Sequence, residues 1–344
     1  MRSDFSKPSI DIANEAQRWT AQQEALLARQ RDISSHLQGR ELRAACLLCG
    51  GSLTSSKAYT HRGIDYLACG RCGHFQTSVR LPQGYPHAQN LAGFEAIYPD
   101  LDDVGYRSRR DRIYAPKLDW LLARIEETGR SVEGVLQAKW LEIGCGAGYF
   151  LHALRARGAS TVLGLDENNV LVDVANRQCG APVARVSECI FSDLEQSDAD
   201  VITAFFVLEH IEEAQRFWQI LANKPSGTLF AFAVPTFGLS TVIEGALDGF
   251  AARNLDNVVH TQLYTDQSID QALKSAGYQK VAEWLFGQDA QDLCSVLLNQ
   301  LASHMDDTLL DDLAQHLSTL VDPLQQVIDR ARLCDARHVL AVRQ

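Results

Sequence analysis

Residues 141–150 (LEIGCGAGYF) constrain this chain more than any other segment. An apolar run leads into three glycines at alternate positions, Gly144, Gly146 and Gly148, and a pattern typical of a helix follows. This order of strand, glycine turn and helix brings backbone N–H groups and a helix N-terminus to a small ligand. The third glycine comes one residue too early for a dinucleotide fingerprint, and Glu142 would repel a pyrophosphate. The turn therefore favours a ligand with a cationic, amino-acid-like end.

The chain around this turn alternates between strand-like and helix-like segments, which predicts an α/β fold with a doubly wound, Rossmann-like sheet. The last two predicted strands are separated by a helical insertion at 288–334, which has no Lys or Arg before Arg330 and which we expect to be acidic outside and apolar inside. The predicted strands are 135–143, 161–165, 182–186, 200–207, 227–234, 278–286 and 337–342.

Two helices are expected before the sheet. Residues 11–44 are rich in good helix formers, and we expect this helix to lie along the protein's own surface, with a homodimer through it as the alternative. Residues 107–127 have an apolar face, and Pro116 predicts a break or kink within this helix. Between these helices, the proline-containing stretch 76–103 is interpreted as an irregular connector.

Two C-x-x-C pairs form the most specific signal outside the glycine turn: Cys46 with Cys49, and Cys69 with Cys72. Each pair is followed by a glycine, so two tight turns can point four sulfurs at one centre, in the tetrahedral geometry that Zn²⁺ accepts. With four cysteine ligands and no open position for water, the zinc would be structural. His74 is a nearby bystander or a substitute ligand.

Composition limits the compartment and the partners. No apolar run approaches the roughly 18–20 residues that span a bilayer, and the first residues lack the apolar region of a signal peptide. We therefore expect a cytoplasmic protein without a membrane partner, whose nine cysteines are not a disulfide framework. The net charge of −11 disfavours a nucleic-acid partner.

Acidic and aromatic residues follow the later strands. Asp166 ends the second strand 20 residues after Gly146, where a carboxylate can accept hydrogen bonds from both ribose hydroxyls. The alternative for Asp166 is a helix cap. Glu188 follows the third strand and is a candidate for the adenine amino group, and the fourth strand closes on Glu209-His210.

Together, the E-x-G-x-G-x-G turn, Asp166 and the Glu-His strand end resemble class I S-adenosylmethionine-dependent methyltransferases over roughly residues 110–344. The upstream cysteine pairs look like those of the nucleotide-sugar C-methyltransferases and their relatives. This chain has a single histidine, His260, in the loop where those enzymes carry paired histidines. Those enzymes also extend into a separate C-terminal domain after the methyltransferase core, whereas this chain ends at Gln344. The resemblance therefore implies the cofactor more strongly than the acceptor.

The resemblance implies a set of site residues. His210 is a candidate base, unless it and Glu209 only hold the cofactor loop, and His260 and Tyr264 are acceptor-side candidates in the loop 237–265. The cofactor candidates are Glu142, Gly144, Cys145, Gly146, Gly148, Asp166, Glu188 and Phe206.

We therefore expect an enzyme that transfers a methyl group from S-adenosylmethionine to carbon, oxygen or nitrogen of a small-molecule acceptor, such as a sugar or a biosynthetic intermediate. The alternatives are a zinc-ribbon RNA methyltransferase, a protein or lipid-linked-glycan methyltransferase, and a non-catalytic binding module. The expected divisions are a helical arm (1–44), a zinc ribbon (45–80), a connector with a helix (81–129) and the methyltransferase domain (130–344).

Overall fold

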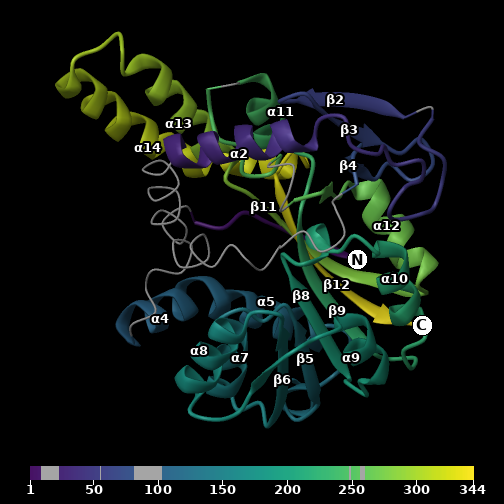
Figure 1. The fold of residues 1–344 in the computed structure, drawn as a ribbon. Coiled ribbons are helices and arrows are strands. Elements are labelled where there is room, and N and C mark those ends of the chain that lie inside the picture. Colours follow the sequence, from purple (N-terminus) through teal and green to yellow (C-terminus); the bar gives the residue numbers. More distant parts are fainter. Residues whose placement is uncertain (9–22, 55, 81–102, 248, 256–259) are drawn as a thin grey trace.

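A central eight-stranded sheet organises the protein (Figure 1). The computed structural model describes residues 1–8, 23–54, 56–80, 103–247, 249–255 and 260–344. The strand order is β1-β11-β12-β9-β8-β5-β6-β7. Strands β5 to β9 pair in parallel, whereas β12 is antiparallel to both of its neighbours. The strands are β1 (Arg2–Phe5), β5 (Lys139–Ile143), β6 (Thr161–Asp166), β7 (Ala184–Val186), β8 (Val201–Phe205), β9 (Leu229–Pro235), β11 (Tyr278–Phe286) and β12 (Ala336–Arg343).

Helices cover both faces of this sheet, so the predicted doubly wound α/β class is confirmed. Side chains alternate between the faces of a strand, and Trp140 and Leu141 accordingly belong to different apolar clusters. One face carries α5 (Ala115–Glu126), α7 (Tyr149–Ala156) and α8 (Asn169–Cys179), and the other carries α9 (Ile190–Gln196), α10 (Ala214–Ala222) and α12 (Asp266–Ser275).

The first predicted strand begins too early at 135. Residues Val132–Leu136 form the short helix α6, and β5 begins at Lys139. Ser131 caps α6, because its side chain accepts a hydrogen bond from the Gly134 N–H at 3.1 Å. The apolar run therefore contains one turn of helix before the strand.

The N-terminal strand β1 is absent from the predicted strands. It lies parallel to β11 at the sheet edge, and the Asp4 carboxylate accepts a hydrogen bond from Trp120 Nε1 at 2.9 Å. Helix α2 (Gln23–Leu37) follows, and Leu37 packs against Ile64 and Val79 of the same chain. The expected surface position of this helix agrees with that packing, and the homodimer stays a prediction. Residues 9–22 of the predicted helix lie outside the described residues.

The helix predicted at 107–127 is continuous from Asp103 to Glu126, and the break or kink predicted at its proline corresponds to a change to π-helical geometry just before it. It consists of α4 (Asp103–Arg109), a π-helical turn η2 (Arg110–Tyr114) and α5. Pro116 lies in the first turn of α5, where its missing N–H leaves no helical hydrogen bond unmade. Most of the predicted connector, residues 81–102, lies outside the described residues.

A second, four-stranded sheet carries the cysteine pairs. Its strand order is β10-β4-β3-β2. Strand β10, which comes much later in the sequence than the other three, pairs with β4. This sheet lies against the α10 and α12 face, where Cys46, Cys69 and Cys72 join the main apolar cluster. The predicted loop 237–265 therefore contains both a helix and a strand. The elements are β2 (Lys57–His61), β3 (Ile64–Ala68), β4 (Phe75–Thr77), α11 (Leu239–Ala246) and β10 (Gln262–Leu263).

The insertion before β12 forms a pair of helices, α13 (Asp289–Leu301) and α14 (Asp307–Arg330), that extends from the sheet (Figure 1). The prediction that its acids lie outside is wrong for Asp289, Asp292 and Asp329, which are buried. Each of these carboxylates has a partner inside the protein, as where Arg253 Nη2 donates to Asp292 at 2.7 Å. Across the described part of the chain, no helix has the length and apolar character needed to cross a membrane.

The buried Glu283 of β11 makes stability depend on pH. Burial opposes its charge, but hydrogen bonds from Arg332 and the charges of Arg337 and Lys280 lower the pKa of Glu283 to about 2. A carboxyl with a lowered pKa stabilises the fold above its unfolded value, and this contribution is lost as the pH falls between about 4.5 and 2. Glu283→Gln should therefore flatten the fall in unfolding free energy across this range, measured by urea denaturation. The exposed Glu133→Gln is the control, and an unchanged slope in Glu283→Gln would contradict the assignment.

Candidate functional site

The glycine turn lies at the carboxyl end of β5, with all three glycines in the left-handed region. Their φ angles are 64° at Gly144, 51° at Gly146 and 74° at Gly148. A Cβ at Gly144 would overlap the Val207 side chain, and a Cβ at Gly148 would lie 2.5 Å from the Cβ of Ala175. Both the backbone angles and the close contacts therefore require glycine.

Asp166 lies beside this turn, at the end of β6. Its carboxylate accepts hydrogen bonds from the Gly146 N–H at 2.7 Å and from the Asn168 N–H at 2.9 Å. Burial raises the pKa of Asp166, and these backbone hydrogen bonds oppose that rise. Helix α8 is capped by Asn168, which accepts hydrogen bonds from the N–H groups of Val170 and Leu171. Asp166 thus ties the turn to β6, and the cap belongs to its neighbour.

Glu142 is a buried acid immediately before the turn. Its side chain is 4% exposed, and its Oε2 has no hydrogen-bond partner within the described residues. Burial raises the pKa of Glu142 well above its ordinary value, against the attraction of the Lys117 ammonium. The described residues thus leave one oxygen of this buried carboxyl group without a hydrogen bond.

Tyrosines cover the same turn from α4 and η2. The Tyr106 ring stacks on Tyr149 at 4.3 Å between centroids, and Tyr114 stacks on Tyr149 at 5.1 Å. The Tyr106 hydroxyl also donates to the Ala147 carbonyl at 2.9 Å. The sequence pattern did not indicate this cover, because the rings meet across three separate elements. An aromatic residue directly after the last glycine was the available signal.

The carboxyl end of β8 has a strained backbone. Phe206 has a φ of 58°, which is uncommon for a residue with a side chain, and its N–H donates to the Ala233 carbonyl at 2.8 Å. Its ring lies 6.3 Å from the His338 ring and 5.6 Å from Lys117 Nζ. Such outliers gather at binding sites. Lys117 and His338 were both missed by the sequence analysis.

Glu209, His210 and His260 come together next to this strand end. Glu209 and His210 belong to the short helix η3 (Leu208–His210), and His260 precedes β10. His210 Nε2 lies 3.9 Å from Glu209 Oε1, and the two imidazole rings are 5.1 Å apart. Burial raises the pKa of Glu209 to about 8. Both histidines are half-buried, whereas Glu209 is buried. The two imidazole rings are therefore more accessible to solvent than the carboxyl group.

Tyr264 is buried, whereas His210 and His260 are half-buried. It is 1% exposed, and its ring lies 4.9 Å from that of His74 beside the cysteine-bearing sheet. Burial raises the pKa of Tyr264 above its ordinary value. This position favours a packing role over the predicted contact with an acceptor. Glu188 is exposed after β7, at the same sheet edge as Asp166.

Gln262 connects the cysteine-bearing sheet to η3 and was missed by the sequence analysis. Its Oε1 lies 2.9 Å from His74 Nε2, and its Nε2 donates to the carbonyls of Leu208 and Ile211. Because these carbonyls flank Glu209 and His210, one amide side chain holds the segment that carries both groups. No sequence motif marks such a residue.

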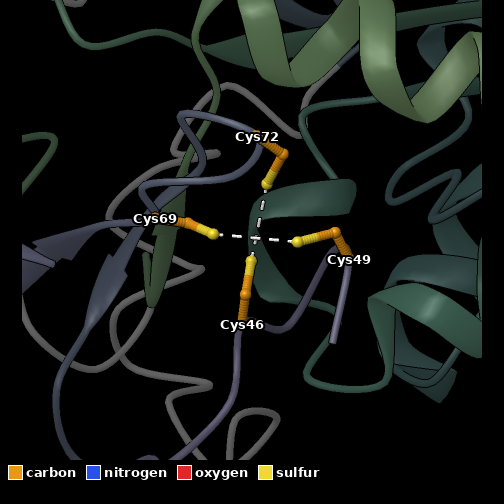
Figure 2. A group of neighbouring side chains, drawn as sticks. All are labelled: Cys46, Cys49, Cys69 and Cys72. Carbon is orange, nitrogen blue, oxygen red and sulfur yellow. Dashed lines mark hydrogen bonds between the residues drawn. The ribbon is translucent and has the colours of Figure 1, made fainter. Parts of the chain in front are cut away.

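The four cysteines of the two pairs converge on one point (Figure 2). The sulfurs of Cys46 and Cys72 lie 3.7 Å apart, as do those of Cys49 and Cys69. Zinc–sulfur bonds of about 2.3 Å in a tetrahedron place sulfurs about 3.8 Å apart, so the spacing fits zinc. The Cys72 thiol lowers the pKa of Cys46 to about 5, which favours a thiolate. Turn hydrogen bonds at Gly50 and Gly73 shape the two pairs alike.

Comparison with known proteins identifies the family. A family model described as a methyltransferase domain matches residues 106–283, which is just over half of the chain. The biotin biosynthesis bifunctional protein BioHC of Cellvibrio japonicus is 29% identical over 176 residues, covering 49% of this chain and 31% of the relative. The ubiquinone biosynthesis O-methyltransferase of Photorhabdus laumondii is 31% identical over 150 residues, covering 41% of this chain and 59% of the relative. The chain thus spans less than two thirds of the length of either relative.

Among solved structures, magnesium protoporphyrin IX methyltransferase from Synechocystis with bound SAH is similar, with a TM-score of 0.45 and 15% identity. The match covers 76% of this chain and 97% of that one. From the family model and the sheet topology, the chain belongs to the methyltransferase-domain family, in the class I group that uses S-adenosylmethionine.

Proposed function

We propose that this protein transfers a methyl group from S-adenosylmethionine to a small-molecule acceptor bound beside Glu209, His210 and His260. The observation that carries the proposal is the arrangement at one sheet edge. A glycine turn with one buried acid, Glu142, and one half-buried acid, Asp166, lies at the ends of β5 and β6, and the half-buried histidines lie beyond the end of β8. Ligands bind at this edge in open α/β sheets.

The residues around the turn fit the cofactor. Asp166 would accept hydrogen bonds from the ribose hydroxyls, and Glu142 would compensate the charge of the amino-acid ammonium group. The left-handed glycines allow the backbone to approach the ligand closely, with no Cβ in the way. The tyrosines on Tyr149 cover the turn and keep water from it.

S-adenosylmethionine, when bound, supplies an electrophilic methyl group on a sulfonium sulfur. The protein therefore has mainly to align the acceptor and exclude water. If the acceptor reacts through an O–H or an acidic C–H, a proton must leave it, and His210 or His260 is positioned to influence that loss. A neutral amine would attack without a base.

A biosynthetic small molecule is the acceptor class that we favour. One curated relative is named as an O-methyltransferase of ubiquinone biosynthesis, and the other as a protein of biotin biosynthesis. The resemblance to nucleotide-sugar C-methyltransferases adds sugars to this class.

Calorimetric titration with S-adenosylhomocysteine tests cofactor binding. The unaltered protein should bind it, and Asp166→Ala should bind at least about tenfold more weakly, because two hydrogen bonds to hydroxyls would be lost. Asp198→Ala is the matched control, since this exposed carboxylate pairs with Lys139 before β8, away from the turn. Absence of binding, or equal binding by Asp166→Ala, would refute the cofactor site.

We also propose that residues 45–80 form a zinc ribbon held by one structural Zn²⁺ on the four cysteines. Elemental analysis of Cys49→Ser should show one zinc per chain fewer than the unaltered protein, with a lower melting temperature, because zinc binding stabilises such a fold. The exposed, solitary Cys189→Ser should keep both the zinc and the stability. Equal zinc content in Cys49→Ser and Cys189→Ser would contradict the ribbon.

A further inference from the structure

The group formed by Glu209, His210 and His260 has the composition of a metal site. It offers one carboxylate oxygen and two imidazole nitrogens, and these three atoms all lie within 4.8 Å of one another. Two imidazoles with one carboxylate form a common protein ligand set for divalent first-row transition metals. The four-sulfur site is chemically different, because thiolates select softer ions.

Glu209 supplies an independent reason to expect a cation. Its side chain is 0% exposed, and neither carboxylate oxygen has a hydrogen-bond partner within the described residues. The 3.9 Å approach of His210 Nε2 is too long for a hydrogen bond. A buried carboxylate without hydrogen bonds is costly unless it is paired or bound to a metal. Within the described part of the chain, the Glu209 carboxylate oxygens therefore lack the partner that such a buried group requires.

The backbones that carry the three groups are already fixed to each other. Thr261 Oγ1 donates to the Glu209 carbonyl at 3.4 Å, and Gln262 Nε2 donates to the carbonyls of Leu208, the first residue of η3, and Ile211, the residue after it. Neighbouring ligands of a metal at about 2.1 Å lie roughly 3.0–3.4 Å apart. Small side-chain rotations would reach this spacing, with no change of fold.

We propose that Glu209, His210 and His260 bind one divalent transition-metal ion, such as Mn²⁺, Fe²⁺, Co²⁺ or Zn²⁺. Three protein ligands leave positions open for an oxygen of the acceptor. The ion would hold that oxygen at the sheet edge and favour its deprotonated form. The role in acceptor binding rests on the proposed methyltransferase function, whereas binding of the ion does not.

The test is a titration with Mn²⁺ of protein whose four-cysteine site is loaded with zinc, because thiolates bind Mn²⁺ poorly. The concentration of free Mn²⁺ is measured at each step by electron paramagnetic resonance. One Mn²⁺ per chain should bind. His210→Ala and His260→Ala should each weaken binding at least about tenfold, and Glu209→Gln should do the same without loss of volume. His316→Ala, an exposed histidine on α14, is the matched control and should bind normally.

The same samples are titrated with S-adenosylhomocysteine. If the protein binds S-adenosylhomocysteine but binds none of Mn²⁺, Co²⁺ and additional Zn²⁺, the metal site is overturned and the methyltransferase proposal stands. If it binds the metal ion but not S-adenosylhomocysteine, the metal site stands and the methyltransferase proposal is overturned. Metal affinity unchanged in all three variants would also overturn the site. If an alanine variant unfolds, as seen by its melting curve, the isosteric Glu209→Gln decides.

Discussion

The pairing of β10 with β4 is the contact on which the acceptor side of the site depends. It joins a strand from the methyltransferase part of the chain to the sheet of the cysteine pairs. Two residues before this strand lies His260, and within it lies Gln262, whose amide holds η3. The cysteine-bearing sheet thus acts as a support for Glu209, His210 and His260. A metal at the four sulfurs would fix this support from its far side.

The buried glutamates differ in whether the protein itself completes their hydrogen bonds. Glu142 and Glu209 each have a carboxylate oxygen that lacks a hydrogen bond within the described residues. By contrast, Glu244 accepts hydrogen bonds from the N–H groups of Arg253, Asn254 and Leu255. All three acids are at most 4% exposed, so burial alone does not account for the difference. The two acids with an unpartnered oxygen lie at the carboxyl edge of the sheet, where we propose that the cofactor and the acceptor bind.

Much of the fold could be predicted because its signals are local. The glycine turn requires left-handed backbone angles, and apolar runs of strand length between helices imply a doubly wound sheet. The prediction failed where tertiary contacts override local pattern. Residues 135–138 contain apolar residues suited to a strand, but the Ser131 cap favours a helical turn. The strand β1 has a polar sequence, and its pairing with the edge strand β11 stabilises it.

For the candidate site, the sequence by itself determined the residue types: three glycines in a turn, two acids near it, a Glu-His strand end and four cysteines in pairs. Their chemistry and spacing are local properties of the chain. Only the tertiary structure decided which distant groups meet, since His260 joins Glu209 through strand pairing and Tyr264 is withdrawn into the core beside His74. The tertiary structure also revealed three further residues of the candidate site, Gln262, Tyr106 and Lys117. Their roles depend on contacts between elements far apart in the sequence, which no local pattern encodes.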